Sequence, residues 1–151
     1  MSIDNRYQGQ SSSGLKYGII EVTTLCQFRC PGCYMVVQCH LNRGDMTLAQ
    51  AINVLDLCCN FCGHELETMD ILGGEPLLWP HLEMYIEELL RRGILPWVFT
   101  NMSAITPERA KWLFERNVHI TGKLNIADPT DTKQIVLQAE MIGATVTAAR
   151  K

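Results

Sequence analysis

The sequence lacks a long apolar run, an apolar leader and an excess of basic residues. No stretch of its 151 residues approaches the roughly 18 consecutive apolar residues of a membrane-spanning helix. The polar N-terminus, rich in Ser, Gln and Gly, lacks the apolar core of a secretory signal. The formal net charge of −3 argues against a protein that binds the nucleic-acid backbone, which usually needs a basic face. These absences predict a cytoplasmic protein that is not attached to a membrane.

Cysteine, by contrast, is abundant, with seven residues in this short chain. Because no secretory signal is recognisable, these cysteines indicate metal or redox chemistry more than disulfides. The composition, 47% hydrophobic and 19% charged, is that of a globular protein with a substantial core. We expect a flexible leader over residues 1–16, whose serines and glycines bury little surface, and a single domain over residues 17–151.

Strand-like and helix-like segments alternate along this domain. The expected strands are residues 18–23, 68–72, 97–100 and 119–126. The expected helices are residues 48–62, 81–92, 106–117 and 131–142, the first opened by a capping box of Thr47 and Gln50. Such alternation predicts parallel strands joined by right-handed crossovers. A barrel of eight units needs about 250 residues, so this α/β chain is expected to form a partial (βα) barrel of about four parallel strands that stays open.

The first motif with chemical meaning is the C-x3-C-x2-C run of Cys26, Cys30 and Cys33, which follows the first expected strand. Soft thiolates suit zinc or iron–sulfur sites. Three ligands leave one metal position open, as a site that binds a reactant requires. Two other interpretations stay open at this point: a zinc site completed by Cys39 or His40, and a disulfide.

The second motif, Gly73-Gly74-Glu75-Pro76, follows the second expected strand. Two glycines let a ligand approach the backbone closely, and the glutamate offers an acceptor for an ammonium group. The alternative is an ordinary turn from strand to helix. Because the carboxyl ends of parallel strands share one edge of a sheet, both motifs are expected on the same rim. This placement favours one shared site over two unrelated turns.

Together these motifs resemble the radical S-adenosylmethionine (radical SAM) superfamily, in its core domain, from residue 17 to about residue 143. The resemblance implies that Cys26, Cys30 and Cys33 hold three irons of a [4Fe–4S] cluster. The amino and carboxylate groups of S-adenosylmethionine would chelate the fourth iron. Gly73, Gly74 and Glu75 match the family motif that receives the methionine amino group. Relative to a six-unit member, the chain is short or C-terminally truncated, so the resemblance implies an incomplete barrel.

Further cofactor contacts are expected by position. Gly32 occupies a place that is often aromatic in the family and that contacts adenine through its backbone, and Tyr34 offers a ring nearby. Thr100 and Asn101 end the third strand, although a Thr-Asn pair is also ordinary turn chemistry. Two residues on one face of the fourth strand are expected to bind the ribose or carboxylate, or else to lie at a solvated strand end: Lys123 and Asn125.

The resemblance implies an enzyme that reductively cleaves S-adenosylmethionine to a 5′-deoxyadenosyl radical, which abstracts hydrogen from an unknown substrate in a maturase-like reaction. It also implies an external one-electron donor of the flavodoxin or ferredoxin type. A compact activase of glycyl radical enzymes is one alternative, because it shares the run C-P-G-C-Y at residues 30–34. A non-catalytic iron–sulfur or zinc module, or a truncated fragment, is another. The open sheet edge predicts a partner chain or homodimer.

Three further cysteines, Cys58, Cys59 and Cys62, follow one another along the first expected helix. Cys59 and Cys62 lie on its apolar stripe, where cysteine behaves as a small buried hydrophobe. A second metal site formed by Cys58, Cys62 and His64 is the alternative, because residues four apart share one face of a helix.

Overall fold

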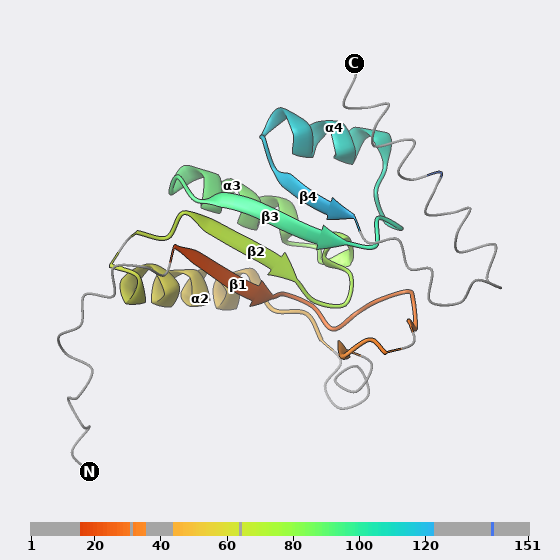
Figure 1. Cartoon of the computed structure of the whole chain (residues 1–151), viewed down its shortest axis with the longest axis horizontal. Coiled ribbons are helices and arrows are strands. Elements are labelled where there is room, and N and C mark those ends of the chain that lie inside the picture. The colour runs from red at the N-terminus through yellow and green to blue at the C-terminus, as the bar shows by residue number, and fades with distance from the viewer. Residues whose placement is uncertain (1–15, 31, 36–43, 64, 123–139, 141–151) are drawn as a thin grey trace, which may run out of the picture.

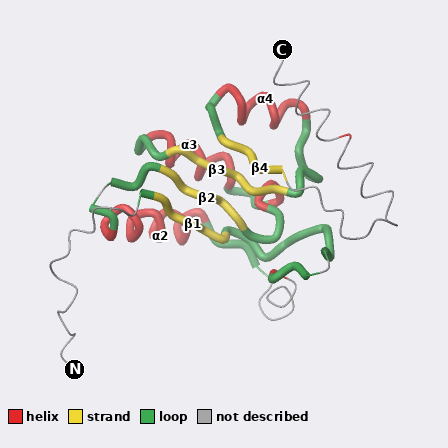
Figure 2. The backbone as a smooth tube through the Cα atoms, in the orientation of Figure 1, coloured by secondary structure: helices red, strands yellow, loops and turns green. Residues whose placement is uncertain are grey.

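The computed structural model describes residues 16–30, 32–35, 44–63, 65–122 and 140 (Figures 1 and 2). Lys123, Asn125 and the helix expected over residues 131–142 lie outside these ranges, apart from residue 140, as does nearly all of the expected leader. The elements follow in the order β1 (Tyr17–Glu21), α2 (Leu48–Phe61), β2 (Thr68–Leu72), the short 3-10 helix η1 (Pro76–Leu78), α3 (Leu82–Arg91), β3 (Leu95–Thr100), α4 (Pro107–Glu115) and β4 (His119–Gly122).

The sheet has four parallel strands in the order β1-β2-β3-β4, so each described crossover joins neighbouring strands. The predicted alternation and parallel pairing are therefore confirmed. β2 has the expected bounds, whereas β3 begins at Leu95 rather than residue 97 and β1 ends at Glu21 rather than residue 23. Residues 123–126, the expected end of the fourth strand, lie outside the described residues. The 3-10 helix η1 was not anticipated, because Gly73-Gly74-Glu75-Pro76 indicated only a turn.

Local sequence signals set the helix starts. The capping box of α2 forms as expected: the Gln50 amide donates to Thr47 Oγ1 at 3.2 Å and the Thr47 amide donates to Gln50 Oε1 at 2.8 Å. Pro107 occupies the first turn of α4, where Thr106 caps the Arg109 amide at 3.2 Å. Among the described residues, no helix is long and apolar enough to cross a membrane.

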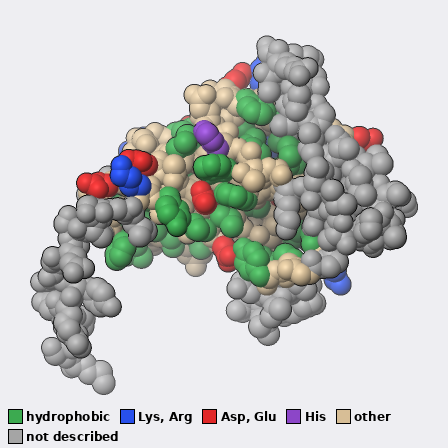
Figure 3. Space-filling model, in the orientation of Figure 1, with side chains coloured by type: hydrophobic (Ala, Val, Ile, Leu, Met, Phe, Trp, Pro, Cys, Tyr) green, Lys and Arg blue, Asp and Glu red, His purple; other side chains and the backbone are tan. Residues whose placement is uncertain are grey.

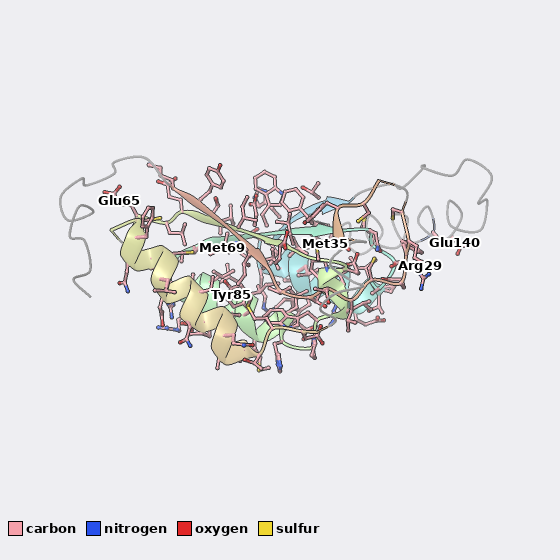
Figure 4. All side chains as sticks on the ribbon, turned by 90° about the horizontal axis from the view of Figure 1, so that it is seen from below. Arg29, Met35, Glu65, Met69, Tyr85 and Glu140 are labelled. Atoms are coloured by element: carbon pink, nitrogen blue, oxygen red, sulfur yellow. The ribbon has the colours of Figure 1, made fainter. Side chains whose placement is uncertain are left out.

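The helices α2, α3 and α4 cover one face of the sheet, and the core lies between these layers (Figure 4). Ile20, Ile71 and Val98 are neighbours in register on this face and are almost fully buried. Figure 4 labels Met69 and Tyr85 on the same side. Cys59 and Cys62 are buried in this core at 8% and 6% exposure, as their place on the apolar stripe predicted.

The opposite face of the sheet is not covered by any described helix (Figures 1 and 4). One row across this face joins Ile19, Asp70, Trp97 and His119 in register on the four strands. These residues alternate with the buried ones, as the twofold repeat of a strand requires. The next row toward the carboxyl end of the sheet includes Phe99 and Thr121, which are also in register. We call this surface the open face.

Candidate functional site

The two sequence motifs meet at the carboxyl edge of the sheet, where they line one cavity of about 410 Å³. The loop that follows β1 contributes the cysteines, and the segment that follows β2 contributes the glycines. The cavity is lined by Cys26, Phe28, Cys30, Gly32, Cys33, Tyr34, Met35, Leu72, Gly73, Gly74, Phe99, Thr100, Asn101, Thr121 and Gly122. The expectation of one shared site on this rim is therefore met by the geometry.

The three cysteines of the first motif are half-buried and none forms a disulfide. Cys26 Sγ accepts from the Phe28 amide at 3.4 Å and from Asn101 Nδ2 at 3.6 Å. Burial raises the pKa of the Cys26 thiol, while the Phe28 amide opposes that shift and the neighbouring acidic groups add to it. A metal centre binds the thiolate, so it would have to displace this proton, and its positive charge would offset the unfavourable burial of the thiolate.

Cys26, Cys30 and Cys33 line one cavity but do not converge on a single point. Within the described part of the chain, no three His, Cys, Asp or Glu side chains converge closely enough to hold one metal ion. A [4Fe–4S] cluster does not need such convergence, because each thiolate binds a different iron. Cys26, Cys30 and Cys33 around a common cavity suit that requirement. Cys39, His40 and His64, named in the two alternative metal sites, lie outside the described residues.

Gly73 and Gly74 are required by the close approach of the chain to itself. The Gly74 amide donates to the Thr23 carbonyl at 2.8 Å, and the Glu75 amide donates to the Leu25 carbonyl at 2.8 Å. A Cβ atom at Gly73 would lie 2.4 Å from the Thr23 carbonyl oxygen, and one at Gly74 would lie 2.2 Å from that of Leu25. Gly73 also has a φ of +144°, which side chains disfavour. The two glycines therefore let the segment after β2 pack directly against the backbone at the start of the cysteine loop. We call this contact the glycine clamp.

Glu75 directly follows the cavity-lining Gly74 and is fully buried. Its Oε1 accepts from Thr100 Oγ1 at 2.5 Å and from the Leu77 amide at 3.0 Å, and its Oε2 accepts from the Asn101 amide at 2.7 Å. Burial raises the pKa of Glu75, although these three donors and Arg109 oppose the shift. The carboxylate thus ties the end of β2 to the end of β3. Glu75 is not among the residues that line the cavity, and its expected role as an acceptor for the methionine ammonium stays a prediction.

Thr100 and Asn101 are brought to the site as expected, with different roles. Thr100 is 4% exposed; its hydroxyl donates to Glu75 and accepts from the Met102 amide at 2.8 Å. Asn101 directs its amide nitrogen toward Cys26, while its Oδ1 accepts from the Ser103 amide at 2.8 Å. Asn101 is therefore the polar side chain of this pair that faces the cysteines.

Gly32 and Tyr34 also line the cavity. Gly32 has a φ of +73°, a conformation that glycine adopts without strain, so the departure from an aromatic residue suits the local backbone. The Tyr34 hydroxyl donates to Glu21 Oε1 at 2.8 Å, and burial together with this carboxylate raises the pKa of Tyr34 to about 12.

Several lining residues were missed by the sequence analysis, among them Leu72, Phe99 and Thr121. Each lies on the open face near the carboxyl end of its strand. The signal that finds them is alternation: they occupy every second position, between residues that face the core.

Comparison with known proteins decides the family. The model of the radical SAM superfamily matches residues 20–148. The chain belongs to this superfamily. The fold agrees, because the chain superposes on the crystal structure of BtrN in complex with AdoMet and 2-DOIA with a TM-score of 0.58. That match covers 68% of this chain and 42% of BtrN at 21% identity.

Two curated relatives of this radical SAM chain match most of its length. One is the tungsten-containing aldehyde ferredoxin oxidoreductase cofactor-modifying protein of Pyrococcus furiosus, which is 28% identical over 138 residues. The other is the PqqA peptide cyclase of Streptomyces rochei, 29% identical over 133 residues. These matches cover 91% and 87% of this chain but only 38% and 35% of the relatives. The chain thus spans little more than a third of the length of either relative. Membership of the superfamily implies a [4Fe–4S] cluster and S-adenosylmethionine as cofactors.

Proposed function

We propose that this chain carries the cofactor-binding part of a radical SAM enzyme of the maturase type. The observation that carries the proposal is the single cavity that three cysteines share with Gly73 and Gly74. A simple electron carrier does not need the second motif. When bound, the cluster and S-adenosylmethionine would supply a 5′-deoxyadenosyl radical for hydrogen abstraction, by one-electron cleavage of the sulfonium.

The residues of the chain have separate tasks in this proposal. Cys26, Cys30 and Cys33 would each hold one iron and leave the fourth iron for S-adenosylmethionine. The backbone of Gly73 and Gly74 would face the methionine moiety, because both residues line the cavity beside the cysteines. Glu75 is a positioning residue: it fixes the ends of β2 and β3 so that the two motifs keep their spacing.

Apolar side chains in the cavity lining would limit contact of water with the reacting atoms. Phe28, Met35, Leu72 and Phe99 place apolar side chains in the lining. Phe99 and Leu72 belong to the sheet, whereas Phe28 and Met35 belong to the segment that carries the cysteines. A water-excluding lining prevents quenching of a reactive carbon radical. It also strengthens the polar contacts that orient the cofactor, because local screening is weak there.

The relatives guide the proposed substrate class and partners. One is named for modifying a cofactor and the other for cyclising a peptide, so we expect a peptide or a cofactor precursor as the substrate. We further propose a cytoplasmic location and an electron donor of the flavodoxin or ferredoxin type. Both fit a cluster that must be reduced before each cleavage.

Formation of 5′-deoxyadenosine tests the proposal. The protein is reconstituted with iron and sulfide without oxygen, then treated with dithionite and S-adenosylmethionine, and the products are quantified chromatographically. The wild type should form 5′-deoxyadenosine and methionine, and Cys30→Ala should form neither. Cys58→Ser is the matched control, because Cys58 is also half-buried but lies on α2 away from the cavity. An intact cluster that yields no product would leave the non-catalytic iron–sulfur module as the better account.

A further inference from the structure

The centre of the open face carries a carboxylate that the cofactor site does not use. Asp70 is in the middle of β2, a central strand, and is paired in register with Ile19 on one side and Trp97 on the other. Its neighbours along the strand, Met69 and Ile71, are fully buried on the helix-covered face. Alternation therefore places Asp70 on the open face, where Figure 3 shows acidic groups among hydrophobic side chains.

Asp70 has no hydrogen bond or ion pair with any described residue, although it is half-buried. Desolvation by its surroundings raises the pKa of the Asp70 carboxyl. The other acid near this surface, Glu21, already accepts the Tyr34 hydroxyl at 2.8 Å. A partly desolvated carboxylate with no partner in the described part of the chain lowers the stability of that part, and a cationic ligand would account for its place at the centre of this face.

Aromatic side chains lie between the row of Asp70 and the cofactor cavity. Trp97 stacks on Phe99 with ring centroids 6.1 Å apart, and Phe99 lines the cavity. The Trp97 indole also donates to Thr121 Oγ1 at 2.7 Å, and Thr121 lines the cavity as well. Asp70 is two residues before Leu72, so its row is roughly 7 Å along the strand from the row in the cavity wall. A molecule on this row would reach the place where the radical is generated.

We propose that Asp70 and Trp97 bind an ammonium-bearing part of the substrate. The carboxylate would pair with the cation, and the face of the indole ring would contact the ammonium group or the adjoining carbon chain. This inference rests on the proposed function, because it places the substrate beside the cofactor cavity. An ammonium satisfies both groups, since the carboxylate offers a charge-assisted hydrogen bond and tryptophan is the best aromatic partner for a cation. The substrate class is thus an amine, an amino sugar or a peptide with a basic group.

Binding of a probe pair tests the site without knowledge of the substrate. The reconstituted protein with S-adenosylmethionine is titrated at pH 7.5 with phenethylammonium and with 2-phenylethanol, its neutral isostere, by calorimetry. Phenethylammonium should bind roughly tenfold more tightly, because hydrogen bonds to charged groups are the stronger class. Asp70→Asn should remove this preference, whereas Trp97→Leu should weaken the binding of both probes.

Two further variants control the experiment. Asp70→Glu keeps the charge and should retain part of the ammonium preference. Glu115→Gln removes an exposed carboxylate at the end of α4 and should leave the preference unchanged. Equal binding of the two probes to the wild type, or an ammonium preference that survives in Asp70→Asn, would overturn the inference.

The same preparation separates this inference from the proposed function. Formation of 5′-deoxyadenosine by the wild type, together with no ammonium preference, would refute the Asp70 site and leave radical chemistry standing. An Asp70-dependent preference in a protein that forms no 5′-deoxyadenosine would support the ammonium site and refute the proposed function. Far-ultraviolet circular dichroism of each variant shows that the comparison is made between folded proteins.

Discussion

Glu75 and Asp70 are close in sequence, but their carboxylates differ in burial and in hydrogen bonding. Glu75 is fully buried at the carboxyl end of the sheet and accepts three hydrogen bonds. Asp70 is half-buried on the open face and has no partner among the described residues. The difference indicates that the first carboxylate holds the fold together and the second is available to a ligand. The Tyr85 hydroxyl and His81 Nδ1 are also buried polar atoms without a hydrogen-bond partner among the described residues.

A substitution in the glycine clamp should cause the largest loss of stability. Gly74→Ala places a Cβ atom 2.2 Å from the Leu25 carbonyl oxygen, and both atoms belong to backbone that cannot move independently. We expect a loss of about 3 kcal/mol or more in the free energy of unfolding, measured by urea denaturation of the unloaded chain. Gly44→Ala is the matched control, because nothing lies within 4 Å of the added atom. Equal stability of the two variants would contradict the clamp.

Glu75→Gln should destabilise the chain by about 2 kcal/mol. The glutamine amide keeps one acceptor but brings two donors into a site where three donors already converge. Urea denaturation measures the effect, with Glu67→Gln as the exposed control. If Glu75→Gln were as stable as that control, the carboxylate would not be the tie between β2 and β3, and the contrast with Asp70 would fail.

Glu88 provides a paired acid on the surface. Arg91 and Arg92 hydrogen-bond its carboxylate at 2.6 to 2.8 Å and lower the pKa of Glu88 to about 2. Because the pKa in the folded chain is below the unfolded value, its stabilisation is present above about pH 4.5 and is lost toward pH 2. Glu88→Gln should therefore lower the free energy of unfolding by about 0.5 kcal/mol at neutral pH and leave it unchanged near pH 2. Urea denaturation across this pH range measures the difference.

Asp70→Asn should have the smallest effect and the opposite sign. The raised pKa of Asp70 means that its ionised form is disfavoured in the folded chain, so the penalty is present at neutral pH and disappears as the group is protonated. The variant should be more stable by less than about 0.5 kcal/mol at pH 7, with no gain at acidic pH. Thermal unfolding at several pH values measures this difference. A clear destabilisation at neutral pH would show that Asp70 has a structural partner.

Much of the architecture follows from local signals in the sequence. The Thr47–Gln50 capping box, the Thr106–Pro107 start and the alternation of strands with helices predicted the observed elements and their parallel pairing. The two motifs predicted where the site lies, because both follow strands that end at one edge. These features depend on neighbouring residues along the chain, so they can be read from the sequence.

What the sequence did not reveal depends on contacts between distant segments. Gly73 and Gly74 line the cavity, but the sequence did not reveal that a Cβ atom at either position would also collide with the backbone of Thr23 or Leu25. The expected role of Glu75 as an acceptor for an ammonium group stays a prediction; the fold adds that its oxygens accept from Thr100 and the Asn101 amide. The sequence does not single out Asp70, because its lack of a partner among the described residues is a property of the assembled sheet. The expected roles of Lys123 and Asn125 remain predictions.

The most direct test of the account is the electron paramagnetic resonance spectrum of the reduced, reconstituted protein, recorded with and without S-adenosylmethionine. We predict a signal typical of a [4Fe–4S]⁺ cluster whose g values change when S-adenosylmethionine is added, because it would bind an iron that has no cysteine ligand. Cys58→Ser should behave in the same way, and Cys33→Ala should lose the signal. A cluster spectrum that S-adenosylmethionine leaves unchanged, or a protein that takes up only zinc, would contradict the account.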